Sequence, residues 1–234
     1  MADDADRDEQ LDEILATYEG YDRGGRSSLW DLDNPGFRRL SLERDAAIDG
    51  SIAASAGPGG RARLLDLGCG NGSLAVRLRA EGLAIDVTGV DLVPGAVEAA
   101  RQNAPWATFR TGSADRLEDD DASYDILTAI TLFSSLPSAA LEVAVAREAG
   151  RVLRPGGHLV WYDIRYRNPW NAAVHGVSKA RLAELFPGWA MDLRSFSVLP
   201  PVARRLGHTT PILYPALHAI PPFRSHLVGR LTRP

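Results

Sequence analysis

The chain has 234 residues, of which 45% are apolar and 24% charged, as in a soluble globular protein of one large α/β domain or two small ones. Its net charge of −4 argues against a general affinity for nucleic acid, and its single cysteine excludes a disulfide framework. Because no apolar run reaches the ~18 residues of a membrane span and the N-terminus is acidic, unlike a signal peptide, we expect a cytoplasmic protein without a membrane span.

Two helices are predicted before the first strand. Residues 9–19 place Leu11, Ile14, Leu15 and Tyr18 on one face of a short helix. A second helix is expected over 36–55, and it ends at the breaker run 56–60. We therefore expect residues 1–60 to form an N-terminal helical cap, and residues 61–234 to form the main domain of a single compact unit.

Short apolar runs and amphipathic segments alternate after residue 61. The expected strands cover 63–67, 85–91, 107–111, 124–131 and 158–163, and the helices between them cover 73–80, 94–103 and 138–152. This alternation predicts βαβ units and a parallel sheet that is covered by helices on both faces. A helix at 178–186 and strands at 190–197 and near 225–231 are expected to follow, with a proline-rich segment, 199–222, between those two strands.

A glycine-rich loop follows the first predicted strand. Gly68, Gly70 and Gly72 occupy alternate positions, and a helix is expected to begin directly after them. Glycines at such a turn let the backbone approach a ligand closely. A dinucleotide-binding loop would need its third glycine at position 73, which is Ser73.

The run from Asp66 to Gly72 resembles motif I of the class I S-adenosylmethionine-dependent methyltransferases. The resemblance implies that S-adenosylmethionine is the cofactor, that the glycines and Cys69 wrap its methionine portion, and that Asp66 helps to hold its amino group. It also implies a three-layer α/β/α sandwich. In this fold a doubly wound, seven-stranded, mostly parallel sheet has an antiparallel last strand and an N-terminal helical preface.

A carboxylate is expected at the end of the second strand. Asp91 can accept hydrogen bonds from both ribose hydroxyls there, and Leu92 lies beside it in the predicted site. The alternative role for Asp91 is an N-cap of the helix that starts at Pro94. Dinucleotide enzymes use the same device, so Asp91 indicates a ribose without naming the cofactor.

Three later segments agree with the same family. The resemblance places Ser113, Ala114 and Asp115 near the adenine, and Ala129 at the end of strand four beside the methionine portion. The run 151–159 matches the family's late motif, a helix end that turns into strand five. The N-terminal preface commonly folds over the cofactor in this family, and Tyr21 is its candidate aromatic contact.

The methyl acceptor is expected at the ends of strands four and five, where ligands bind in open parallel sheets. Asp163 and His175 are the candidate general bases, although Asp163 could instead cap a turn and His175 could be a surface or packed residue. Four further residues are candidate substrate contacts, and they are Arg165, Tyr166, Asn168 and Phe133.

Several features of the sequence limit the class of molecule that can be the methyl acceptor. An Asn/Asp-Pro-Pro-Tyr-like motif is missing after strand four, which argues against methylation of DNA or protein amides. A weaker resemblance to a bacterial subgroup associated with polysaccharide and secondary metabolism favours O-methylation of a sugar or natural product. The five histidines are scattered, so no metal site is expected. An S-adenosylmethionine-binding enzyme that does not methylate, such as a cyclase or decarboxylase, and a non-catalytic partner subunit are the alternatives.

Charge is distributed unevenly along the chain. Residues 1–13 hold seven acids and one base, whereas residues 193–234 hold six arginines and no acid. A solvated acidic helix and a basic rim account for this pattern, and a basic surface that attracts an anionic substrate is the sharper alternative. The segment 199–222 could be a substrate lid or the contact of a homodimer.

Overall fold

The computed structural model of the protein describes residues 2–23, 31–57, 61–166 and 174–234, and within the first helix the side chains of residues 5–18. Seven strands form one sheet in the order β3-β2-β1-β4-β5-β7-β6. The strands are β1 (Ala62–Leu67), β2 (Ile85–Asp91), β3 (Thr108–Thr111), β4 (Tyr124–Ile130), β5 (Leu153–Ile164), β6 (Ala190–Val198) and β7 (Arg224–Thr232).

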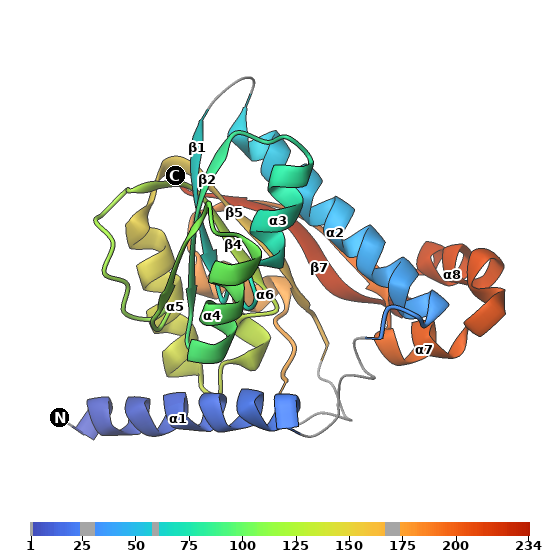
Figure 1. The fold of residues 1–234 in the computed structure, drawn as a ribbon, viewed down its shortest axis with the longest axis horizontal. Coiled ribbons are helices and arrows are strands. Elements are labelled where there is room, and N and C mark those ends of the chain that lie inside the picture. The colour runs from blue at the N-terminus through green and yellow to red at the C-terminus, as the bar shows by residue number, and fades with distance from the viewer. Residues whose placement is uncertain (1, 24–30, 58–60, 167–173) are drawn as a thin grey trace.

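Neighbouring strands from β3 to β5 are parallel, whereas β7 is antiparallel to both β5 and β6. Helices cover both faces of this sheet (Figure 1). The helices are α1 (Ala2–Arg23), α2 (Pro35–Ala56), α3 (Ser73–Ala80), α4 (Pro94–Asn103), α5 (Ala139–Val152), α6 (Lys179–Leu185), α7 (Pro200–Arg205) and α8 (Thr210–Ala219). The predicted doubly wound α/β/α sandwich with an antiparallel last strand is therefore confirmed.

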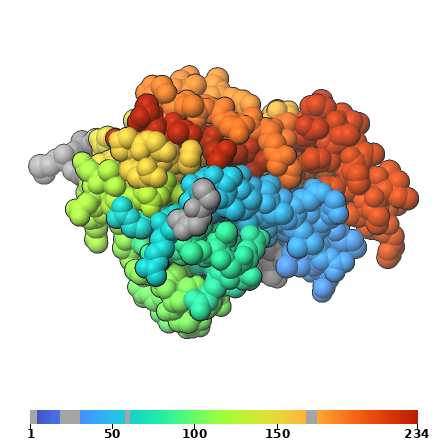
Figure 2. All heavy atoms as spheres, turned by 90° about the horizontal axis from the view of Figure 1, so that it is seen from above, coloured from blue at the N-terminus to red at the C-terminus, as the bar shows by residue number. Residues whose placement is uncertain are grey.

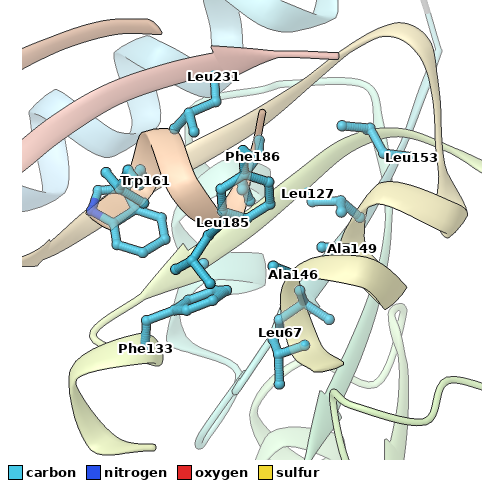
Figure 3. Close-up of a cluster of buried hydrophobic side chains, with 14 of the residues drawn as sticks. Leu67, Leu127, Phe133, Ala146, Ala149, Leu153, Trp161, Leu185, Phe186 and Leu231 are labelled. Carbon is cyan, nitrogen blue, oxygen red and sulfur yellow. The ribbon is translucent and has the colours of Figure 1, made fainter. Parts of the chain in front are cut away.

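The core has two layers, one on each face of the sheet. On the face covered by α5 and α6, Phe133, Trp161 and Phe186 are fully buried, and the ring centroids of Phe133 and Trp161 lie 4.9 Å apart. Figure 3 shows these rings among leucines and alanines from the strands and α5. On the other face, Ile48 and Ile52 of α2 are fully buried against the sheet. Each such side chain contributes roughly 1.5–3 kcal/mol by its burial.

The strand order creates the position of the site. The chain moves outward from β1 to β2 and β3, and then returns to the other side of β1 to form β4 and β5. Between β1 and β4 the connections leave in opposite directions, which opens a crevice at the carboxyl ends of these strands. The loops after β1, β2, β3 and β4 all meet at this edge.

Helix α1 lies across that edge (Figure 1). Arg7 Nε donates to Asp115 after β3 at 2.5 Å, and the Tyr18 hydroxyl donates to Ser135 Oγ after β4 at 2.9 Å. Leu11 and Ile14 pack against the core between these two contacts. The predicted helix over 9–19 is thus the middle of a longer one, which the acidic first residues extend.

The proline-rich segment contains two helices, α7 and α8, that were not predicted from its sequence. Prolines stand in the first turn of both α7 and α8. A proline is compatible with a helix there because its missing N–H would have no intrahelical partner. Pro215 lies inside α8, where it removes one helical hydrogen bond. Within the described ranges no helix is both long and apolar enough to cross a membrane.

Candidate functional site

The glycine loop after β1 turns through left-handed backbone three times. Gly68, Gly70 and Gly72 have φ angles of 73°, 51° and 75°, a region that residues with a Cβ rarely adopt. At Gly72 a Cβ would also lie 3.0 Å from the Cβ of Ala100 in α4. The loop therefore requires glycine both for its backbone conformation and for the close approach of α4.

The backbone amides of this loop are bonded inside the protein. Those of Gly68 and Cys69 donate to the Val90 carbonyl at 2.8 and 3.1 Å, and that of Gly70 donates to Asp91 Oδ2 at 2.8 Å. A phosphate-binding loop instead presents free N–H groups to the ligand. The loop therefore suits a ligand that needs close backbone contact without phosphate groups.

Asp91 stands at the end of β2, where it is partly exposed beside the loop. Its Oδ2 accepts from Gly70, and its Oδ1 accepts from the Val93 N–H at 2.9 Å. The helix N-cap is Val93, so Asp91 does not hold the capping position itself. Each carboxylate oxygen can accept a further hydrogen bond, so both remain able to bind a pair of hydroxyls.

Asp66 lies in β1 below the glycine loop and is buried. Burial raises the pKa of its carboxyl group to about 7, and the negative charge of Asp91 adds to this effect. The Thr128 hydroxyl, on the neighbouring strand β4, donates to Asp66 Oδ1 at 2.5 Å and acts in the opposite direction. A buried carboxylate with this raised pKa is suited to a cationic partner, such as an ammonium group.

Asp115 lies after β3, with Ser113 and Ala114 just before it. Burial would raise the pKa of Asp115, but hydrogen bonds from Arg7 and the Ser113 hydroxyl outweigh this effect and lower the pKa. Asp115 is therefore held as a carboxylate, and α1 is bound directly to the part of the site that the sequence assigned to adenine. An amino group arriving there would share this carboxylate with Arg7.

The loop after β4 carries local backbone strain. Thr131 has a φ of 53°, which is unusual for a β-branched residue, and its side chain is exposed. Its N–H donates to the Tyr162 carbonyl of β5 at 2.7 Å.

Asp163, buried at the end of β5, accepts from the Ser134 N–H of the same loop at 3.0 Å. Burial raises the pKa of Asp163 to about 6. Asp163 thus fixes the β4 loop against the end of β5.

His175 joins the same loop from the other side. Its backbone N–H donates to the Ser134 carbonyl at 3.0 Å, and its Nε2 lies 2.5 Å from Glu142 Oε1 of α5. The hydrogen bond that His175 donates to the Glu142 carboxylate raises the pKa of His175, and the charge of Asp163 acts in the same direction. Arg181 binds the second oxygen of Glu142 at 2.7 Å, so the carboxylate that orients the imidazole is itself held in place.

A basic hollow lies beyond β5. It has a volume of about 370 Å³, and its lining includes Arg165, Tyr166, Lys179 and Ser195. Arg165 donates to the Arg224 carbonyl at 2.8 Å and stacks on the Tyr166 ring. Among the described residues neither Arg165 nor Lys179 forms an ion pair with a carboxylate. The hollow therefore offers two cations without a counter-charge.

The remaining predicted residues have different positions. Leu92 is partly exposed beside Asp91, whereas Cys69 and Ala129 are buried. Phe133 has no exposed surface and packs in the core under the β4 loop, so it supports that loop rather than lining the hollow. The side chain of Tyr21 and the whole of Asn168 lie outside the described residues.

Three residues that contribute to the site were not predicted from the sequence, namely Arg7, Thr128 and Glu142. Thr128 faces Asp66 only because β4 pairs with β1, a register that emerges once the strand order is known. Arg7 is separated by 108 residues from the carboxylate that it binds. Glu142 has no local signal, because it stands in an ordinary amphipathic helix.

A family model described as a methyltransferase domain matches residues 64–157. The 27-O-demethylrifamycin SV methyltransferase of Amycolatopsis mediterranei is 33% identical over 140 residues, which cover 57% of this chain and 48% of that enzyme. A ubiquinone biosynthesis O-methyltransferase of Xanthomonas campestris is 30% identical over 172 residues, which cover 71% of this chain and 68% of that enzyme. The matched region thus spans about half of the first relative and about two thirds of the second.

Solved structures share the fold at low sequence identity. The cyclase SpnF superposes with a TM-score of 0.60 at 20% identity, and the match covers 81% of each chain. A putative sarcosine dimethylglycine methyltransferase from Galdieria sulphuraria gives a TM-score of 0.62 at 18% identity, over 84% of this chain and 86% of that one.

The raised pKa of Asp66 predicts how stability depends on pH without a ligand. The folded state keeps a proton on Asp66 between about pH 4 and 7 that the unfolded state has lost, so this group lowers stability progressively across that range. Asp66→Asn removes the cost. In urea unfolding, the difference in unfolding free energy between the variant and wild type is expected to grow by about 3 kcal/mol in favour of the variant from pH 5 to pH 8. Parallel stability curves would contradict the raised pKa.

Proposed function

Because the chain belongs to the class I S-adenosylmethionine-dependent methyltransferases, we propose that it transfers a methyl group from S-adenosylmethionine to a hydroxyl oxygen of a small polar molecule, a sugar or a natural product. The observation that carries the proposal is the meeting of the glycine loop, Asp66 and Asp91 at one edge of the sheet. The names of the relatives support oxygen as the acceptor atom, since both are O-methyltransferases or act at an O-methyl position.

The residues at the crevice between β1 and β4 each bind a different part of the cofactor. Asp91 accepts hydrogen bonds from the ribose hydroxyls, and the glycine loop lies against the methionine portion. Asp66, below the loop, compensates the charge of the amino group. When bound, S-adenosylmethionine would supply an electrophilic methyl group: the acceptor oxygen would bond to the methyl carbon, and the sulfur would leave as the neutral thioether of S-adenosylhomocysteine. Asp115 and Ser113 complete the site on the adenine side.

His175 acts as the general base in this proposal. Its Nε2–H donates to Glu142, so in the neutral ring the lone pair that can take a proton is on Nδ1. Its backbone is fixed to Ser134 in the loop after β4, which is the edge where the acceptor must lie. Asp163 holds the same loop through Ser134, and we assign it as a positioning residue because it is buried.

The basic hollow beside β5 is suited to bind an anionic group on the acceptor. Arg165 and Lys179 bring two positive charges next to the end of β5, and the described residues that line the hollow include no acid. The surrounding chain is also basic, since residues 193–234 contain no acid. A carboxylate or phosphate on the acceptor would be attracted to this side, while its hydroxyl lies towards β4.

A non-methylating enzyme on the same fold is the second candidate. The similarity to the cyclase SpnF shows a shared fold, and a shared fold does not determine the reaction. Deprotonation of a hydroxyl group requires a base at the acceptor edge, such as a histidine paired with a carboxylate. A cyclase does not require such a base. The arrangement of His175 and Glu142 therefore favours methyl transfer.

The proposed reaction is tested with methyl-labelled S-adenosylmethionine and a panel of hydroxyl-bearing sugars and aromatic natural products. The panel contains matched members with and without a carboxylate or phosphate. We expect label in an ether product together with S-adenosylhomocysteine, and a lower KM for the anionic member of a pair. Conversion of an acceptor without S-adenosylhomocysteine would instead identify the non-methylating alternative.

The pairing of His175 with Glu142 predicts a specific pH dependence. A base must be neutral, so kcat should rise with pH through the raised pKa of His175. Glu142→Gln removes the charge that raises this pKa, and the acid limb of the profile should move to lower pH. His175→Ala should lower kcat by roughly 10²–10⁴-fold.

The matched control is Glu184→Gln, which removes an exposed acid that pairs with the same arginine, Arg181. This variant should leave the pH profile unchanged. An unshifted profile in Glu142→Gln, or a fully active His175→Ala, would show that His175 is not the base.

A further inference from the structure

Exposed apolar side chains gather at one end of the molecule. Residues 199–223, which form α7, α8 and their short connections and are called the α7–α8 lobe below, project from the sheet beside the start of α2 (Figure 1). The space-filling view shows this lobe as an orange-red projection next to the blue first half of α2 (Figure 2). Ile212 is 77% exposed and Leu42 of α2 is 64% exposed. A monomeric soluble protein rarely clusters such side chains on its surface.

Helix α8 itself is uncharged. Residues 206–223 contain no Asp, Glu, Lys or Arg. Only Thr210 and Tyr214 of α8 are buried, whereas Leu213 and the following Ile220 are 44% and 46% exposed. An amphipathic surface helix would place charged residues on its outer side, and a helix that is apolar all round is normally covered.

The lobe is firmly attached to the domain. At Gly36 of α2 a Cβ would lie 1.8 Å from the Ala203 carbonyl oxygen of α7, so the two helices are in direct backbone contact. The Asn34 side chain donates to the Arg204 carbonyl at 3.0 Å. Leu40, Ala203 and Tyr214 are buried together in a separate small core. The exposed apolar surface therefore belongs to a segment that is packed tightly against α2.

Arginines border the apolar surface. A groove of about 380 Å³ runs between α2 and α8, and Arg38, Arg39, Leu42, Pro211 and Pro215 are among its lining residues. Arg38 and the lobe residue Arg205 are exposed.

Three acids lie nearby, in the first part of α2 and just before it. Glu43 is bonded to Arg39 at 2.8 Å, and Asp31 accepts from the backbone of Asp33 in the turn that precedes α2. The lobe itself contributes positive charge alone, because residues 193–234 contain no acid.

Two occupants could cover this surface, and its charge distinguishes them. In a two-fold dimer the lobe would meet a second copy of the same patch, so both sides of the interface would carry arginines and neither lobe would supply an acid. An anionic lipid surface satisfies both parts of the patch, because acyl chains accept the apolar side chains and headgroups accept the arginines. We propose that the α7–α8 lobe docks on an anionic membrane surface, with α8 lying in the plane of the interface.

The topology gives this docking a consequence for the site. Strand β6 is parallel to β5, because both are antiparallel to β7, so α7 leaves β6 at the same edge of the sheet where β4 and β5 end. Docking through α8 would therefore attach the domain to the lipid surface through β6, a strand that ends at the same edge of the sheet as β4 and β5. The docking itself does not depend on the proposed methyl transfer.

The proposal is tested by co-sedimentation of the full chain with vesicles of phosphatidylcholine alone or with 30% phosphatidylglycerol. We expect binding to the anionic vesicles, and a loss of at least about tenfold in affinity for Ile212→Ser/Leu213→Ser. Arg38→Gln/Arg39→Gln should weaken binding about tenfold or more, and added salt should weaken wild-type binding. Val143→Ser, at an exposed apolar position on α5, is the matched control and should bind like wild type.

Three results would overturn the proposal. The first is a wild-type chain that does not sediment with anionic vesicles. The second is equal binding to both kinds of vesicle, because the arginines would then have no role. The third is a dimer in light scattering that Ile212→Ser/Leu213→Ser dissociates, which would make a second copy the occupant. Circular dichroism of each variant confirms that a loss of binding does not come from unfolding.

Discussion

The hydrogen bond from the Gly70 amide to the Asp91 carboxylate links the two halves of the cofactor edge. It joins the loop after β1 to the end of β2, and it is possible because the loop bends through left-handed backbone at Gly68, Gly70 and Gly72. The loop amides that bond to Val90 and Asp91 are no longer available to an external anion. The same turn therefore leaves these three amides unable to donate to a phosphate, and it is followed directly by α3.

Carboxylates dominate this edge, and the fold holds each of them differently. Asp66 is buried with a raised pKa, whereas Asp115 is kept ionised by Arg7 of α1. A cationic ligand would relieve the first of these two groups. The site thus costs stability in the free protein and recovers it on binding, as expected where binding groups are arranged in advance. Helix α1 belongs to this arrangement because its Arg7 is bonded to Asp115.

Local patterns predicted the sheet and the glycine loop, because strands such as 85–91 and helices such as 94–103 are specified by their own periodicity and by prolines and glycines at their ends. Contacts between distant segments could not be predicted. The bond between Thr128 and Asp66 needs the strand order, and that between Arg7 and Asp115 spans most of a domain. Proline content suggested an irregular segment at 199–222, but prolines in first turns are compatible with helices, and α7 and α8 form there.

Binding of S-adenosylmethionine by Asp91 and the glycine loop is tested by calorimetric titration of the cofactor into three proteins. Wild type should bind with micromolar affinity, and Asp91→Ala should lose on the order of 2 kcal/mol because its hydrogen bonds to the ribose are absent. Asp86→Ala, an exposed acid on the same strand, should bind like wild type. If wild type does not bind, or if all three proteins bind equally, the assignment of this edge to S-adenosylmethionine is wrong, and NAD becomes the ligand to titrate.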